Sequence, residues 1–396
     1  MMRALLTLGM LSALLPASVQ TAYGQTETVL YSFGEYPDGA NPVANPVLGK
    51  KKNLYGTTRY GGAYNAGTVF EVTPSGTEKV LHSFEVTGTD GYYPYAGLIV
   101  DKKRNLYGTT ADGGTIGTNG AGTVFELTPS GTETILHVFQ ANGTDGYLPS
   151  ADLVMDKLGN LYGTTYYGGA YGYGTVFELT PTGTETILHS FNYDGTDGYY
   201  TQAALALDKH GNLYGTTPAG GAYGFGMVFK LTPTGTETIL HSFLPEGTDG
   251  CNPLSSPILD KKGNLYGTTQ GCGAYGEGTV FKLTPLGSET ILYSFGSNGT
   301  DGYLPYGSLI FDKKGNLYGT TNSGGAYRFG TVFKLTPSGT ETILHSFNPG
   351  NGTDGYMPSG DSLLLDKEGN LYGTTALGGG YSCNGNGCGT VYKVTP

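Results

Sequence analysis

One hexapeptide, Asn-Leu-Tyr-Gly-Thr-Thr, recurs seven times along the chain at intervals of about 52 residues. The copies begin at Asn53, Asn105, Asn160, Asn212, Asn264, Asn316 and Asn370. A repeat of this length is typical of solenoids, propellers and other arrays, in which each unit forms one supersecondary structure and buries its apolar face against its neighbours. The fold must therefore contain seven similar units.

Each unit contains four short β-like segments, which the sixth copy shows as PYGSLIFD, NLYGTT, GTVFKLTP and TETILHSF. Turn residues separate the segments, and no copy shows the 3.6-residue spacing of an amphipathic helix. The high glycine content, 69 of 396 residues, agrees with many tight turns. We therefore predict an all-β fold, a seven-bladed β-propeller of four-stranded antiparallel blades.

The repeats are out of phase with the chain ends, which predicts how the ring closes. The segment TETVLYSF at residues 26–33 resembles a fourth strand, whereas the last copy stops after its third strand, GTVYKVTP. We expect the N-terminal strand to complete the last blade, which would leave no unpaired edge at the junction. Residues 25–396 would then form a single propeller domain.

Residues 1–24 have the layout of a secretory signal peptide, with a basic start, an apolar run and small residues before a cleavage point near residue 24. We expect a secreted, periplasmic or extracellular protein without membrane insertion, and a monomer. The formal net charge of −11 argues against nucleic acid as a partner.

The four cysteines suggest two disulfide bonds in an exported protein. Cys251 replaces the Tyr of a GTDGY link and Cys272 replaces a Gly of the GGAY loop in the same blade, on two loops that we expect to meet. Cys383 and Cys388 both lie in the enlarged loop of the last blade. We therefore predict the pairs Cys251–Cys272 and Cys383–Cys388.

The segments NLYGTT, GGAYGYGTVF and LTPxGTETxLHSF resemble the GloVer tandem repeat family of exported bacterial proteins, which includes choice-of-anchor repeat proteins. The resemblance covers residues 26–396 and implies export and a propeller-like fold. The order LIFDKKGNLYGTT then GTVFKLTP is more distantly similar to NHL and lactonase-like propellers.

Strand alternation places the DKKG and SG hairpins on one face, and the GTDGY links and GGAY loops on the opposite face, here called the link face. Each link carries an aspartate in the same position, with Asp38 in the first copy. The others are Asp90, Asp145, Asp197, Asp249, Asp301 and Asp354. Such an aspartate can cap its own backbone turn, or it can bind a ligand or a calcium ion, for which backbone carbonyls would have to supply most ligands.

Tyrosines also recur on the link face. They are Tyr64, Tyr171, Tyr223, Tyr275 and Tyr327 from GGAY, and Tyr92, Tyr147, Tyr199, Tyr303 and Tyr356 from GTDGY. These rings can pack between blades or stack on sugar rings. Five histidines share one position of the LHSF strand, and Tyr31 and Tyr293 replace them in two copies. We interpret this position as inter-blade packing with a hydrogen bond.

No serine nucleophile elbow, zinc helix or other catalytic constellation occurs in the sequence, which favours a binding protein over an enzyme and predicts no cofactor. Similar blades suit multivalent binding, and we expect a glycan- or surface-binding ring that uses the link face. Two alternatives remain. One is a polysaccharide lyase or hydrolase that acts at the central depression, and the other is a structural envelope or matrix protein with a protein partner. The departures from the repeat include Tyr200-Thr201-Gln202, where most copies have proline.

Overall fold

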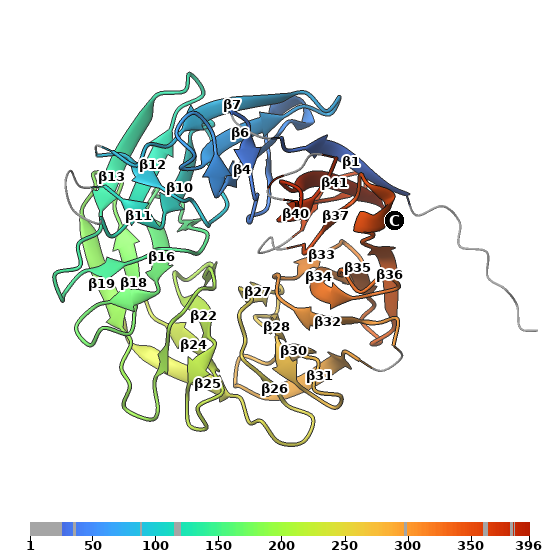
Figure 1. Ribbon diagram of the computed structural model, residues 1–396. Coiled ribbons are helices and arrows are strands. Elements are labelled where there is room, and N and C mark those ends of the chain that lie inside the picture. Colours follow the sequence, from blue (N-terminus) through green and yellow to red (C-terminus); the bar gives the residue numbers. More distant parts are fainter. Residues whose placement is uncertain are drawn as a thin grey trace, which may run out of the picture.

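The computed structural model describes residues 26–34, 37–87, 89–114, 120–296, 299–358, 363–380, 383 and 385–396. The expected signal peptide lies outside the described residues. Seven antiparallel sheets are arranged as blades around a common centre, as Figure 1 shows. The predicted seven-bladed propeller is therefore confirmed.

Each blade has four strands, which run in order from the centre to the periphery. The innermost strands are β3 (Val47–Leu48), β9 (Ile99–Val100), β15 (Val154–Met155), β21 (Ala206–Leu207), β27 (Ile258–Leu259), β33 (Ile310–Phe311) and β38 (Leu364–Leu365). The NLYGTT segments form the second strands, β4 (Leu54–Thr58), β10 (Leu106–Thr110), β16 (Leu161–Thr165), β22 (Leu213–Thr217), β28 (Leu265–Thr269), β34 (Leu317–Gly324) and β39 (Leu371–Thr375).

The outer half of each blade consists of the two longer apolar segments of the repeat. The third strands are β6 (Thr68–Val72), β12 (Thr123–Leu127), β18 (Thr175–Leu179), β24 (Met227–Leu231), β30 (Thr279–Leu283), β35 (Thr331–Leu335) and β41 (Thr390–Thr395). The outer strands are β7 (Glu78–Ser83), β13 (Glu133–Val138), β19 (Glu185–Ser190), β25 (Glu237–Ser242), β31 (Glu289–Ser294), β36 (Glu341–Ser346) and β1 (Thr26–Ser32). Two single 3-10 turns, Lys50–Lys52 and Pro349–Asn351, complete the described secondary structure.

Ring closure occurs as the sequence predicts, because β1 is the outer strand of the last blade. It pairs antiparallel with β41, with Thr26 opposite Thr395, and lies beside it in Figure 1. The amide of Phe33 extends this pairing with a hydrogen bond to the carbonyl of Gly389 (3.0 Å). The first and last described strands therefore belong to one sheet.

The core lies between the blades and not within any one of them. In every junction an aromatic ring that follows an outer strand packs edge to face against a ring on the third strand of the next blade, with centroids 5.0–5.4 Å apart. Phe33 contacts Phe70 in this way, and Phe347 contacts Tyr392. Such pairs stabilise beyond their buried area, so each blade depends on both neighbours.

Short ribbons cover the link face and join each GTDGY link to the loop after the second strand. The pairs are β2 (Gly39–Ala40) with β5 (Tyr60–Gly61), β8 (Gly91–Tyr92) with β11 (Asp112–Gly113), β14 (Gly146–Tyr147) with β17 (Tyr167–Gly168), β20 (Gly198–Tyr199) with β23 (Ala219–Gly220), β26 (Gly250–Cys251) with β29 (Gly271–Cys272), and β37 (Gly355–Tyr356) with β40 (Leu377–Gly378). In the sixth blade β32 (Gly302–Pro305) pairs directly with β34.

The two disulfide bonds agree with this arrangement of loops. Cys251 is bonded to Cys272 across one ribbon, with Cα atoms 5.3 Å apart, and Cys383 is bonded to Cys388, with Cα atoms 5.1 Å apart. Both predicted pairs are confirmed. Disulfides persist in oxidising compartments, so they indicate an extracellular or periplasmic setting. Among the described residues, no helix has the length and apolarity to cross a membrane.

Candidate functional site

The link aspartates turn their carboxylates inward, toward the junctions between blades. Asp197 is representative: Oδ2 accepts hydrogen bonds from the amide of Asn192 (2.9 Å) and from Nε2 of His189 (3.1 Å), and Oδ1 accepts one from the amide of Gly198 (2.7 Å). All seven link aspartates face a histidine or a tyrosine and are buried or half-buried. These carboxylates therefore fix the links to the outer strands and are not directed into open solvent.

The junction histidines each meet a second carboxylate, which belongs to the outer strand of the next blade. His189 Nε2 lies 3.1 Å from Asp197 Oδ2 and 3.7 Å from Glu237 Oε1. The five groups of this kind are His82 with Asp90 and Glu133, His137 with Asp145 and Glu185, His189 with Asp197 and Glu237, His241 with Asp249 and Glu289, and His345 with Asp354 and Glu27. The interpretation of these histidines as hydrogen-bonded inter-blade residues is confirmed for four of them, and His137 Nε2 lies 3.5 Å from Asp145.

The carboxylate pairs shift the protonation of these groups. The pKa of Glu237 is raised to about 7, mainly by burial; the charge of His189 opposes the rise and that of Asp197 adds to it. Burial lowers the pKa of His189, but its hydrogen bond to Asp197 and the charge of Glu237 outweigh burial and leave the pKa raised. One imidazole nitrogen and two carboxylates do not resemble the six to eight oxygens that calcium takes.

The predicted tyrosines lie in two different settings on the link face. The five GGAY tyrosines are 51–57% exposed. Tyr223 borders a shallow hollow of about 490 Å³ together with His241 and Asp249, so it lies near the periphery. The GTDGY tyrosines are half-buried, and Tyr147 stacks on Tyr167 (5.4 Å between centroids). The structure therefore does not bring the two groups together in one site.

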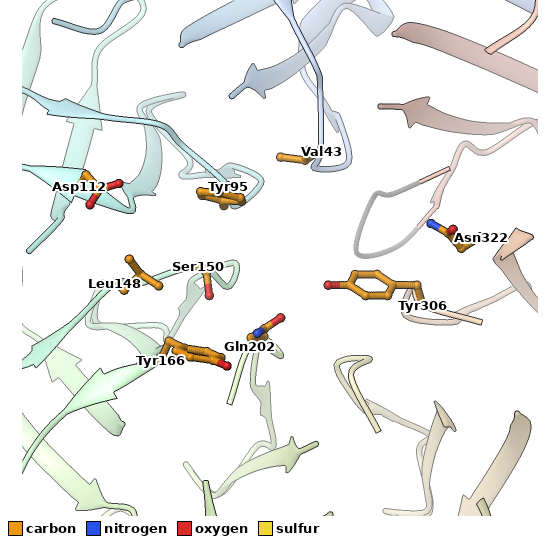
Figure 2. A pocket seen from close by; sticks show the side chains of 9 residues that line it. All are labelled: Val43, Tyr95, Asp112, Leu148, Ser150, Tyr166, Gln202, Tyr306 and Asn322. Atoms are coloured by element: carbon orange, nitrogen blue, oxygen red, sulfur yellow. The ribbon is translucent and has the colours of Figure 1, made fainter. Parts of the chain in front are cut away.

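A separate pocket lies at the centre of the link face. It has a volume of about 410 Å³ and is shown in Figure 2. Its lining comes from five blades, the first four and the sixth, or from the links that lead into them. All of the lining residues are half-buried: Val43, Tyr95, Asp112, Leu148, Ser150, Tyr166, Gln202, Tyr306 and Asn322. Three aromatic rings, two amides, a hydroxyl and one carboxylate thus surround the pocket.

The backbone around this pocket is held in an unusual conformation. One residue in each link has a positive φ of 55–61°: Asn41, Tyr93, Leu148, Tyr200, Asn252, Leu304 and Met357. Positive φ is uncommon for such side chains, and strain of this kind persists where surrounding contacts impose it. At Leu148 these contacts are hydrogen bonds from its amide to Ala121 (2.9 Å) and from Tyr166 to its carbonyl (3.2 Å). Hydrogen bonds on both sides thus hold the backbone of Leu148, the one of these residues that lines the pocket.

One carboxyl group and one cation lie close together at this mouth. Burial raises the pKa of Asp112, while the charge of Arg59 opposes the rise. The Arg59 guanidinium lies 4.2 Å from the ring centroid of Tyr95 and 4.8 Å from that of Tyr60. A cation held over two aromatic faces is stabilised electrostatically, so Arg59 supports the wall that Tyr95 presents to the pocket.

Most of the pocket lining was missed by reasoning from the sequence, which concentrated on residues that recur. The pocket residues occupy repeat positions where the blades differ. Three positions after the end of the link motif, for example, the copies have Val43, Tyr95, Ser150, Gln202 and Tyr306. Only Gln202 was noted as a departure from the repeat. A column-by-column comparison of the seven copies would have identified this variable position.

The fold and its two kinds of site define a tandem-repeat β-propeller with closely similar junctions at the periphery and an asymmetric pocket at the centre. The chain belongs to the Gloeobacter/Verrucomicrobia repeat family, whose model matches residues 17–209 and 195–392. The family resemblance seen in the repeat segments is thereby confirmed. No functionally curated protein matches the chain.

Three solved structures are similar to the chain at low identity, and two of them are described as lactonases. A 6-phosphogluconolactonase, so described, from Bacteroides uniformis is 12% identical with a TM-score of 0.48, over 81% of this chain and 88% of its own. A protein described as a gluconolactonase is 12% identical with a TM-score of 0.43, over 94% and 92%. A protein from Thermus thermophilus, described as an oxidoreductase of the glucose dehydrogenase type, is 15% identical with a TM-score of 0.42, over 94% and 100%. Similarity at this level gives no information about the activity of this chain.

Proposed function

We propose that this is an exported carbohydrate-binding protein that holds a glycan at the central pocket of the link face. The observation that carries the proposal is the chemistry of the lining, in which Tyr95, Tyr166 and Tyr306 present rings beside the amides of Gln202 and Asn322. Aromatic rings pack against the C–H faces of sugars, while amides and hydroxyls exchange hydrogen bonds with sugar hydroxyls. Export is supported by the layout of residues 1–24 and by the two disulfide bonds.

The exposed GGAY tyrosines extend this site for a polymeric ligand. Tyr64, Tyr171 and Tyr223 repeat around the periphery with half or more of their surface exposed. A long polysaccharide that enters the central pocket can make further weak contacts at several blades, and such linked contacts raise avidity without high affinity at any one of them. The proposal therefore combines one selective central site with weak peripheral contacts.

The test is binding of the purified protein to a panel of polysaccharides and oligosaccharides, with Tyr166→Ala and Tyr171→Ala as matched variants. Tyr166 lines the pocket, whereas Tyr171 is exposed and outside its lining. We expect Tyr166→Ala to weaken binding of short oligosaccharides about tenfold, the loss of one aromatic contact, and Tyr171→Ala to leave it unchanged. No binding to any glycan, or equal losses in both variants, would overturn the proposal.

A second candidate, a polysaccharide lyase or hydrolase acting at the same pocket, is favoured by one observation. Asp112 is a half-buried carboxyl with a raised pKa at the pocket wall, which suits acid or base chemistry. Assays of each glycan mixture for newly released chain ends separate the two functions. Release that is lost in Asp112→Asn would make the protein an enzyme.

A further inference from the structure

Five junctions between blades contain the same three ligand atoms, one imidazole nitrogen and two carboxylate oxygens. In each group these atoms lie within 4.8 Å of one another. The histidine and the aspartate come from one outer strand and the link that follows it, and the glutamate comes from the outer strand of the next blade. The repeat therefore produces the same cluster five times.

The spacing within these clusters matches a small transition-metal ion. The distance from His Nε2 to Asp Oδ2 is 3.1–3.5 Å in all five clusters, and that from His Nε2 to Glu Oε1 is 3.6–3.7 Å in four of them. At the closing junction, Glu27 and His345 are farther apart, within 4.8 Å. Tetrahedral zinc with nitrogen and oxygen ligands near 2.1 Å separates them by about 3.4 Å. Two carboxylates also balance the charge of one divalent ion.

Buried oxygens without a hydrogen-bond donor provide an independent observation. Oε1 of Glu133, Glu185, Glu237, Glu289 and Glu27 has no hydrogen-bond partner among the described residues. Asp354 has a side chain only 2% exposed, and its Oδ1 also lacks a partner. Buried oxygens of this kind are costly unless a proton or a cation satisfies them. In four clusters Oε1 of the glutamate faces Nε2 of the histidine, so a cation there would satisfy it. Oε1 of Glu78 and of Glu341, at the two junctions with tyrosine, also lacks a partner among the described residues.

The two remaining junctions show which part of the cluster is dispensable for folding. Tyr31 donates a hydrogen bond to Asp38 (2.8 Å), and Tyr293 donates one to Asp301 (2.8 Å), at the position that histidine occupies elsewhere. A phenol thus satisfies the link aspartate as well as an imidazole does. What the five histidines add is a nitrogen that can coordinate a metal ion.

We propose that each of the five His/Asp/Glu junctions binds one zinc-type divalent ion, and that the two Tyr/Asp/Glu junctions bind none. The fourth coordination position faces solvent, since the histidines are 17–20% exposed and the hollow below Tyr223 opens onto His241 and Asp249. The ion at Glu27, His345 and Asp354 bridges β1 and the sixth blade. It would stabilise the ring at its closing junction.

The test uses the purified full-length protein, stripped of metal with a chelator and dialysed. Titration with zinc by calorimetry should give a stoichiometry approaching five, and cobalt should give the visible absorption of a four-coordinate nitrogen and oxygen site. His189→Tyr copies a substitution that the chain already contains twice, so it should fold and lower the stoichiometry by one. His210→Ala is the control, because His210 is exposed in a hairpin outside all five clusters, and it should change nothing.

A variant that adds a metal site tests the proposal in a second way, because a misfolded protein would not gain a site. Tyr293→His would complete a sixth cluster with Asp301 and Glu341, and the stoichiometry should rise by one. Absence of zinc binding at micromolar concentrations would overturn the proposal, as would a stoichiometry that His189→Tyr and Tyr293→His both leave unchanged. In that case a shared proton satisfies the carboxylates at all seven junctions.

Discussion

The hydroxyl group of Tyr293 lies 2.8 Å from Oδ2 of Asp301 and donates a hydrogen bond to it. The third member of this junction is Glu341 of the next outer strand. Burial, together with the charge of Asp301, raises the pKa of Glu341 to about 8. Glu341 therefore keeps its proton in the folded protein at a pH where the unfolded chain releases it.

This shift predicts that Glu341 lowers the stability of the fold as the pH rises. Its contribution is complete below its ordinary pKa of 4.5 and is lost as the pH rises through about 8. In Glu341→Gln the side chain stays neutral at every pH. We expect the variant to gain stability relative to the natural protein between about pH 5 and about pH 9, as measured by urea denaturation. Parallel pH profiles would contradict the prediction.

Phe33 closes the ring by packing against Phe70, and both rings are fully buried. We expect Phe33→Ala to cost about 3–5 kcal/mol, as large-to-small changes in a core usually do. Phe191→Ala, which removes the equivalent ring inside the continuous part of the chain, is the matched control with a similar cost. Hydrogen exchange should separate them, because only Phe33→Ala should expose the amides of β1 and β41 before global unfolding. Equal protection of these strands in both variants would count against this account of closure.

The glycine of the NLYGTT strand leaves room for the phenylalanine on the neighbouring strand. A Cβ atom on Gly163 would lie 2.6 Å from the Phe177 ring and 2.8 Å from Leu153. Gly163→Ala should therefore destabilise the protein by about 1–3 kcal/mol through overpacking. Gly172→Ala serves as its control, because no atom lies within 4 Å of a Cβ there, although its φ of +87° is strained for alanine. Thermal unfolding of the two variants should show whether crowding at Gly163 destabilises the protein more than backbone strain at Gly172 does.

The disulfide bond between Cys251 and Cys272 closes a longer loop than the bond between Cys383 and Cys388, with sequence separations of 21 and 5. In the chain-entropy treatment, the Cys251–Cys272 bond stabilises the folded protein by about 3 kcal/mol and the Cys383–Cys388 bond by about 2 kcal/mol. We expect Cys251→Ser with Cys272→Ser to lower the free energy of unfolding more than the other serine pair. Cys272 also has a φ of +60° where most blades have glycine. The double variant Cys251→Tyr with Cys272→Gly should recover part of the loss, and failure to recover any would point to a role beyond cross-linking.

The fold was predictable because the same information is present seven times. The period of NLYGTT gave the number of blades, and the phase of TETVLYSF against GTVYKVTP predicted that β1 pairs with β41. Paired departures from the repeat, at Cys251 and Cys272, identified a contact between loops.

The sites were less predictable because they depend on how the blades pack. Glu133 and His137 lie on the same outer strand, yet Glu133 faces His82 of the previous blade while His137 faces Glu185 of the next. The sequence of the strand does not indicate which of the two neighbouring blades each side chain contacts. The central pocket poses the same difficulty, since residues as far apart as Val43 and Asn322 meet there only after closure.

The pairing of β1 with β41 also dictates the order in which the molecule can be completed. β1 is made early, but its partner becomes available only after all the other blades have been made, and nearly the whole chain separates the two strands. Contacts between such distant segments form slowly. A prematurely terminated chain would leave β1 without its partner, with free edge groups that invite aggregation. The last blade can therefore be completed only after every preceding blade has been synthesised.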